Sequence, residues 1–249
     1  MNDLLHNFFD WNLIGQTFPD LLTYGLRNTL VLAITSALLG SVIGMVLAIM
    51  GLSSRSWLRI PARVYTDVFR GLPAALTILM VGEGVFSAQI GWLQSPYPVA
   101  ILALSLMSGA YIGEIFRSGI QSVEKGQGEA CRALGLTHNQ SLRLVVIPQG
   151  VRRVLPAMVN QFIGIIKDSS LVYFLGLVTT QRELFRIGED ASVTSANLSP
   201  LLATGLCYLL LTVPLTHLVN YVDKRLREGS RPVIEPEAPS LLDPAGALA

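Results

Sequence analysis

The sequence predicts an all-α membrane protein with five transmembrane helices, its N-terminus outside and its C-terminus in the cytoplasm. The first observation is composition: 51% of the 249 residues are hydrophobic and 14% are charged, and the mean hydropathy is +0.52. A soluble domain needs more charge than this to cover its surface. The second observation is a series of long apolar runs, and the third is the position of Lys and Arg beside them.

Each apolar run is long enough, at roughly 20 residues, to cross a hydrocarbon core about 30 Å thick. A turn with Gly, Pro and aromatic residues but no cation separates the second run from the third, as expected of an external hairpin. Small residues such as Gly40, Gly44, Ser108 and Gly109 in the first and third runs suit close helix packing. The predicted spans are residues 29–54, 71–91, 97–116, 152–180 and 201–222.

The distribution of positive charge predicts the orientation, because Lys and Arg gather on the cytoplasmic side of a span. Arg55, Arg59 and Arg63 follow the first run directly, which places the N-terminus outside. Of the 18 Lys and Arg residues, all but four lie on the side assigned to the cytoplasm. The exceptions are Arg27, Lys167, Arg182 and Arg186.

The chain divides into one membrane domain and two terminal segments. Residues 1–22 mix aromatic residues with Asp and Asn, which is typical of a periplasmic or interfacial segment, although a frayed tail would look the same. Residues 23–228 form the predicted transmembrane domain, and the Pro- and Ala-rich residues 229–249 form a predicted disordered cytoplasmic tail. No Lys or Arg precedes Arg27, so a cleaved signal peptide is not expected.

Motifs for catalysis and for nucleotide binding are absent from the sequence. There is no G-x-x-x-x-G-K-[ST] phosphate loop, so we do not expect the chain to bind ATP itself. H-E-x-x-H and G-x-S-x-G are also missing, and His6, His138 and His217 lack the spacing of metal ligands. We therefore expect no catalytic residues, no metal and no cofactor, and the net charge of +1 does not suggest a nucleic-acid partner.

The two cysteines are predicted to be free thiols. Cys131 lies in a polar loop and Cys207 in an apolar run, so a disulfide would have to join a loop to a membrane helix. Cys131 is further expected to react with thiol reagents from the cytoplasmic side only.

Three ionisable residues lie inside the predicted spans, where a charge costs roughly 2.5 to 3.5 kcal/mol at mid-helix. Glu83 is expected to face a watery cavity, unless it lies at the outer interface. Lys167 and Asp168 either belong to a transport pathway or pair with residues on other helices. The candidate substrate-pathway residues are Glu83, Asn160, Gln161, Lys167, Asp168 and Ser169.

A polar stretch at residues 126–148, between the third and fourth spans, is predicted to be a cytoplasmic docking loop. Glu129, Ala130 and Ala133 fall at helical spacing with Leu134, and Gly135 follows as a residue that ends a helix in the left-handed conformation.

A second short helix is predicted after the turn of this loop. Leu142, Val145 and Val146 form its apolar stripe, and Pro148 is expected to close it. An ordinary surface helical hairpin would have the same local pattern.

The residues of this loop resemble the signature loop of bacterial ABC-importer permeases. The pattern E-A-x-x-x-L-G followed by I-P-Q begins at Glu129 and ends at Gln149. Residues 110–123 and 148–171 resemble the branch of that family that moves polar amino acids, and the resemblance covers about residues 22–227. One departure is Leu72, which stands where F-R-G-T-P of the family has Thr.

The resemblance implies a multi-pass permease of the bacterial inner membrane that carries polar amino acids without hydrolysing ATP itself. The implied partners are a cytoplasmic ABC ATPase dimer, a second identical or related permease, a periplasmic substrate-binding protein and the surrounding lipid. Another small solute, such as an opine or a compatible solute, is an alternative cargo, and a non-conducting scaffold is the alternative function. The implied coupling-loop residues are Glu129, Ala130, Ala133, Leu134, Gly135, Ile147 and Pro148.

Overall fold

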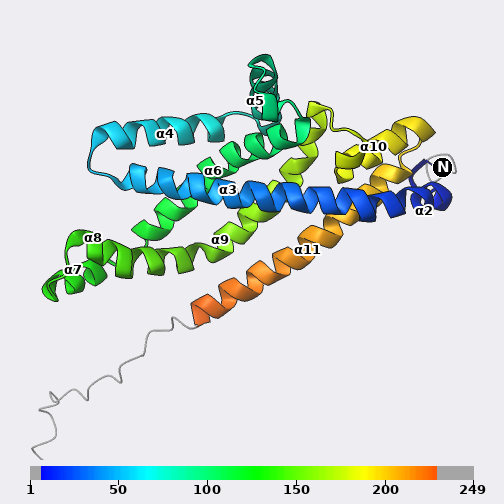
Figure 1. The fold of residues 1–249 in the computed structure, drawn as a ribbon. Helices are drawn as coiled ribbons and strands as arrows, with labels where there is room; N and C mark the ends of the chain where they lie inside the picture. Colours follow the sequence, from blue (N-terminus) through cyan, green and yellow to red (C-terminus); the bar gives the residue numbers. More distant parts are fainter. Residues whose placement is uncertain (1–6, 229–249) are drawn as a thin grey trace, which may run out of the picture.

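The computed structural model describes residues 7–228, and every regular element in that part of the chain is helical (Figure 1). The all-α prediction is therefore confirmed for the described residues. The elements are α2 Trp11–Asp20, η1 Leu21–Gly25, α3 Leu26–Leu52, α4 Ser56–Gly71, α5 Ala74–Ser87, η2 Gly91–Leu93, α6 Pro96–Gln121, α7 Lys125–Ala133, α8 His138–Ser141, η3 Leu142–Val146, α9 Ile147–Asp168, η4 Ser169–Leu175, η5 Thr179–Gln181, α10 Leu184–Ser195 and α11 Ser199–Glu228.

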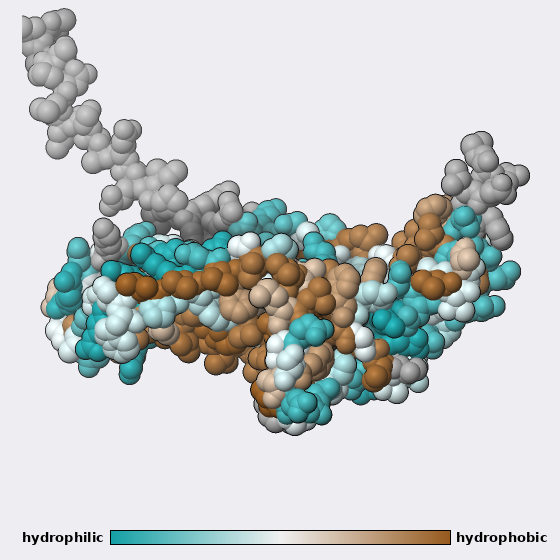
Figure 2. All heavy atoms as spheres, turned by 90° about the horizontal axis from the view of Figure 1, so that it is seen from above, coloured by the Kyte–Doolittle hydropathy of each residue, from teal (hydrophilic) through white to brown (hydrophobic). Residues whose placement is uncertain are grey.

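Three stretches in the described chain are long and apolar enough to cross a membrane: Trp11–Leu52, Pro96–Gln121 and Ser199–Arg225. The pair α4 and α5 makes a fourth if the two helices, bent by 112°, are counted as one span. Helix α9 is not among them. On the face shown in Figure 2, hydrophobic residues form a broad area over the middle of the molecule, between more hydrophilic ends.

The second predicted span, residues 71–91, is not one straight helix. Leu72 is extended (φ −84°, ψ 143°) because Pro73 disfavours the helical conformation of the residue before it. Helix α5 then has only 14 residues, about 21 Å of helix, and projects from the bundle (Figure 1). The sequence analysis did not predict α4, because its arginines were interpreted as the cytoplasmic loop that follows the first span.

The fourth predicted span, residues 152–180, is also shorter than expected. Helix α9 ends at Asp168 and the chain continues in 3₁₀ turns to Gly176, which has a φ of 71°. The hydroxyls of Ser169 and Ser170 donate to the carbonyls of Ile166 and Lys167 at 2.7 Å. Such local bonds compete with the continuation of an α-helix.

Pro148 does not close the second helix of the loop, contrary to the prediction. The chain passes through a π-turn, in which the N–H of Ile147 donates to the carbonyl of Leu142, and then directly into α9. Pro148 occupies the first turn of α9, where a missing N–H costs little.

The tightest helix contact joins α3 and α6, which lie side by side over much of their lengths (Figure 1). A Cβ atom built on Gly44 would lie 2.7 Å from the backbone nitrogen of Gly113, and one on Gly109 would lie 2.7 Å from Ile43 Cγ2. The two backbones therefore touch directly, as small residues allow in membrane helices.

The N-terminal helix α2 continues through η1 into α3 and packs against α10 and α11. Leu21 is fully buried there with Leu184, Ile187 and Ala203. The carboxylate of Asp10 caps α2 by accepting the N–H of Asn12 at 3.0 Å. The predicted disordered tail at 229–249 lies outside the described residues, so the domain boundaries stay a prediction.

Candidate functional site

The loop between α6 and α9 projects from one end of the bundle, opposite the end formed by α2 and α10 (Figure 1). Helix α7 ends at Ala133, and Gly135 follows with a φ of 81°. The Gly135 N–H donates to the Arg132 carbonyl at 3.0 Å, and the Leu136 N–H donates to that of Cys131 at 3.1 Å. The predicted left-handed end of this helix is confirmed.

The next helix, α8, starts with a capping box. Thr137 Oγ1 accepts the N–H of Gln140 at 3.3 Å, and Gln140 Oε1 accepts the N–H of Thr137 at 2.9 Å. These reciprocal bonds satisfy the free donors at the helix start and stabilise the turn between α7 and α8.

The tip of the loop carries apolar side chains that nothing in the described chain covers. Leu134 is 82% exposed and Leu144 is 66% exposed. Large apolar residues grouped with polar neighbours on a surface are typical of a contact with another protein. The other predicted loop residues are exposed Glu129, Ala130, Ala133 and Pro148 and half-buried Ile147.

The base of the loop is held by a second glycine contact, between α6 and α9. A Cβ atom on Gly150 would lie 2.9 Å from Ile120 Cα and 3.0 Å from the Gly119 carbonyl oxygen. Arg153 also donates to the carbonyl of Ser122. The loop is therefore fixed to the two helices from which it emerges.

Both cysteines are free, as predicted, but both are buried. Cys131 is only 6% exposed. The expectation that it reacts with thiol reagents is therefore wrong, because a reagent cannot reach a shielded sulfur, and its cytoplasmic location stays a prediction.

The predicted pathway residues lie on α5, on α9 and at the start of η4. Glu83 is exposed on α5, whose Gly82 faces Leu175 of η4. Asn160 and Lys167 share the exposed face of α9, and the half-buried Gln161 and Asp168 flank them, while Ser169 is buried. No hydrogen bond or ion pair joins Glu83 to Lys167 or Asp168 within residues 7–228.

Glu183 is a buried polar residue that the sequence analysis did not single out. It caps α10 by accepting the N–H groups of Phe185 at 2.5 Å and Arg186 at 2.7 Å. The hydroxyl of Tyr208 in α11 donates to the same carboxylate at 3.1 Å, and Glu183 is 0% exposed. Its position directly before a helical pattern was the available signal.

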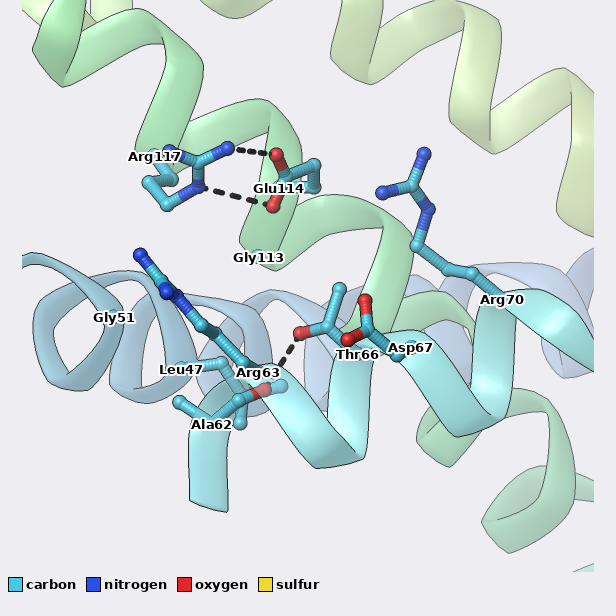
Figure 3. A pocket seen from close by; sticks show the side chains of 10 residues that line it. All are labelled: Leu47, Gly51, Ala62, Arg63, Thr66, Asp67, Arg70, Gly113, Glu114 and Arg117. Atoms are coloured by element: carbon cyan, nitrogen blue, oxygen red, sulfur yellow. Dashed lines mark hydrogen bonds and ion pairs between the residues drawn. The ribbon is translucent and has the colours of Figure 1, made fainter. Parts of the chain in front are cut away.

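A cluster of charged residues was also missed. Arg63, Asp67 and Arg70 of α4 and Glu114 and Arg117 of α6 line a cavity of about 260 Å³ (Figure 3). The signal was their spacing along α4, which places the three charges on one helix face.

The fold and the loop together define a helical subunit of the membrane with several candidate spans and a protruding loop whose apolar side chains are exposed. The family described as "Binding-protein-dependent transport system inner membrane component" matches residues 17–228. The chain belongs to this family, and it is a transport permease component of the inner membrane.

Two curated relatives have similar lengths. The chain is 35% identical over 204 residues to the arginine transport system permease protein ArtQ of Bacillus subtilis (strain 168), covering 82% of this chain and 91% of that protein. It is 34% identical over 224 residues to the glutamate/aspartate import permease protein GltK of Escherichia coli O157:H7, covering 87% and 98%.

A solved structure has the same fold. The structure described as an amino acid ABC transporter with histidines superposes with a TM-score of 0.78 at 28% identity. The match covers 87% of this chain and 99% of that chain. The arrangement of helices is therefore that of an ABC-transporter subunit.

Proposed function

We propose that this chain is the permease of an ABC importer for polar amino acids, driven by ATP hydrolysis on a separate subunit. The observation that carries the proposal is the rigid loop with an uncovered apolar tip at Leu134. Its likeness to permeases named for arginine and for glutamate or aspartate supports the cargo class. We expect residues 229–249 to extend into the cytoplasm.

The proposed topology has five spans, with the N-terminus outside and the loop inside. It counts α2 and α3 as the first span, α4 and α5 as the second, and α6, α9 and α11 as the rest. The charges in α9 then need surroundings other than lipid, because a charge facing hydrocarbon is costly. A second permease copy and an aqueous pathway between the two would supply such surroundings.

The proposed coupling mechanism follows from the two glycine contacts. A cytoplasmic ATPase dimer binds the loop around Leu134, and its closure moves the loop as one piece. The contact of Gly119 with Gly150 passes this movement to α6 and α9. Because α6 also touches α3 directly, the helices tilt together between outward and inward openings, while a periplasmic binding protein delivers the solute outside.

The proposed pathway keeps Glu83, Asn160, Gln161, Lys167, Asp168 and Ser169. A zwitterionic solute loses hydration inside the membrane, so its site needs donors and acceptors from the protein. The exposed side chains of Glu83, Asn160 and Lys167 are available for this role because none is covered within the protomer.

The direct test is reconstitution with the ATPase and binding protein encoded with this permease. We expect ATP-dependent uptake of at least one of radiolabelled L-arginine, L-glutamate and L-glutamine into proteoliposomes. Uptake of an opine or a compatible solute alone would change the cargo, and uptake of no solute despite a stable complex would favour a scaffold.

Replacing Gly135 by valine should uncouple the transporter. A β-branched residue at a φ of 81° costs about 1 kcal/mol or more, so the end of α7 shifts and Leu134 moves. We expect normal amounts of permease in the membrane but loss of solute-stimulated ATP hydrolysis. Gly126→Ala is the matched control, because Gly126 is helical and has nothing within 4 Å of an added Cβ. Wild-type stimulation in Gly135→Val would place the ATPase contact elsewhere.

A cysteine at Asn139 tests the orientation, since Asn139 is exposed in α8 whereas Cys131 is buried. In a variant that also carries Cys131→Ser and Cys207→Ser, an impermeant thiol reagent should label Asn139→Cys in inside-out vesicles only. Labelling in right-side-out vesicles would reverse the proposed topology.

A further inference from the structure

A polar cavity opens between the ends of α3 and α6 and the inner face of α4 (Figure 3). It measures about 260 Å³, enough for a small solute with a few waters. Five of its ten lining residues are charged. They are Arg63, Asp67, Arg70, Glu114 and Arg117.

Some of these charges already have partners within the protomer. The carboxylate of Glu114 forms an ion pair with Arg117, and the Arg70 guanidinium lies over the ring of Tyr111 at 5.5 Å from its centroid. Arg63 and Asp67 have no ion pair among the described residues, although they are one helical turn apart. A guanidinium and a carboxylate therefore face the same hollow without neutralising each other.

The cavity lies near the C-terminal ends of α3 and α6. The Tyr65 hydroxyl donates to the carbonyl of Leu106 at 3.0 Å, which places the middle of α4 beside the middle of α6. The α6 residues that line the cavity, Gly113 to Arg117, precede the end of α6 at Gln121 by about 6 to 12 Å of helix, at 1.5 Å per residue. Charged residues between membrane helices face water-filled cavities or other proteins and mark pathways for solutes and ions.

A neighbouring face of α4 is apolar. Trp57, Ile60, Val64 and Val68 recur at helical spacing, and each is between 47% and 67% exposed. Helix α4 thus carries an exposed apolar face beside the exposed charged residues that line the cavity. This division fits a helix that separates a hydrophobic environment from a polar passage.

We propose that this cavity is an inner, exit-side site for the α-amino acid group of the transported solute. The guanidinium of Arg63 binds the α-carboxylate, and the carboxylate of Asp67 accepts hydrogen bonds from the α-ammonium. Arg70 offers a second positive charge one turn further in, and Thr66 lies between the two arginines. The inference rests on the proposed function, including the proposed orientation of the chain in the membrane. It adds a second solute-binding site to the pathway, on the cytoplasmic side of Lys167.

A cysteine at Thr66 reports on the cavity directly. In the reconstituted complex with Cys131→Ser and Cys207→Ser, we expect the amino acid that the wild type transports to slow labelling of Thr66→Cys from the cytoplasmic side. The corresponding amine, which lacks the α-carboxylate, should not slow it. Ser54→Cys is the control, because Ser54 is exposed but does not line the cavity.

The charges are tested by uptake. Arg63→Gln and Asp67→Asn should each lower the maximal uptake rate about tenfold, as expected when one charge-assisted contact is lost, with permease abundance unchanged. Arg55→Gln removes the same charge just before α4 and outside the cavity, and it should transport like the wild type.

The possible failures are distinct. A wild-type complex that transports no amino acid overturns the proposed function. Wild-type uptake combined with unslowed Thr66→Cys labelling, or with normal rates in both charge variants, overturns only the inner site. If labelling is slowed by phosphatidylglycerol in the vesicles but not by amino acids, the cavity binds a lipid phosphate and the proposal is wrong.

Discussion

Replacing Gly44 by leucine is expected to abolish folding of the membrane domain. A Cβ atom at this position would lie 2.7 Å from the backbone nitrogen of Gly113 and 2.9 Å from Ile112 Cγ2. Real Cβ atoms do not approach backbone atoms so closely, and the opposing atom belongs to a helix backbone that cannot rotate away. The longest helix contact in the protein would therefore have to open.

Alanine at the same position separates the effect of adding a Cβ atom from the effect of adding a larger side chain. We expect Gly44→Ala to destabilise the protein by about 1 to 3 kcal/mol, the range for overpacking a close contact. Gly44→Leu should leave no folded permease in the membrane fraction. The measurement is membrane abundance together with thermal unfolding of detergent-purified protein.

Gly205→Ala in α11 is the control for this series. It makes the same change in another apolar helix, but nothing lies within 4 Å of the added Cβ. Its stability should equal or exceed that of the wild type, since alanine favours helix more than glycine does. If Gly44→Ala were as stable as Gly205→Ala, α3 and α6 would not touch as described.

Replacing Glu183 by alanine is expected to cost about 3 kcal/mol of stability, because three donors lose a buried acceptor. The N–H groups of Phe185 and Arg186 would be left without their cap, and so would the Tyr208 hydroxyl. The loss would loosen the contact of α10 with α11. Thermal unfolding of the purified protein measures it.

We also expect stability to depend on pH through the carboxyl of Glu183, which lies in the connection between α9 and α11. Burial raises the pKa of its carboxyl from an ordinary 4.5 to about 7, against the lowering effect of its donors and of Arg186. The folded protein therefore binds this proton more tightly than the unfolded chain, and stability falls as pH rises from about 4.5 to about 7. Glu183→Gln cannot titrate and should lack this part of the pH dependence.

Glu189→Ala is the matched control, because Glu189 is a partly exposed carboxylate on the same helix. It should change the unfolding temperature little at any pH. Equal effects of Glu183→Ala and Glu189→Ala would show that Glu183 does not hold α10 to α11. A pH profile unchanged by Glu183→Gln would assign the titration to another group.

The end of α7 in the loop between α6 and α9 was predictable because its signals are local. Gly135 ends α7 in the left-handed conformation as expected, since that choice depends on one residue and its absent Cβ. Pro148 was misjudged, because the π-turn before it lets a proline start a helix as readily as end one. Whether Pro148 ends or starts a helix depended on backbone hydrogen bonds that cannot be predicted from residue types.

The surroundings of the proposed pathway residues were predicted less completely. Hydropathy located Glu83, Lys167 and Asp168 as charges in apolar surroundings, but it could not show that α5 is bent away from α4 or that Asp168 ends its helix. It also hid Arg63, Asp67 and Arg70, because the same arginines that mark the cytoplasmic side line a cavity once α4 folds back along α6. The spacing of these charges places them on one face of α4, but it does not show against which helix that face lies.

The sequence by itself determined that the chain is helical, lies in a membrane and carries a short helix ended by Gly135, since composition, hydrophobic run length and cap chemistry act over a few residues. Only the tertiary structure decided that Gly44 touches Gly113, that Glu183 joins α10 to α11, and that charges of α4 meet those of α6. These pairs are far apart in the sequence, and their partners are chosen by how closely helices pack.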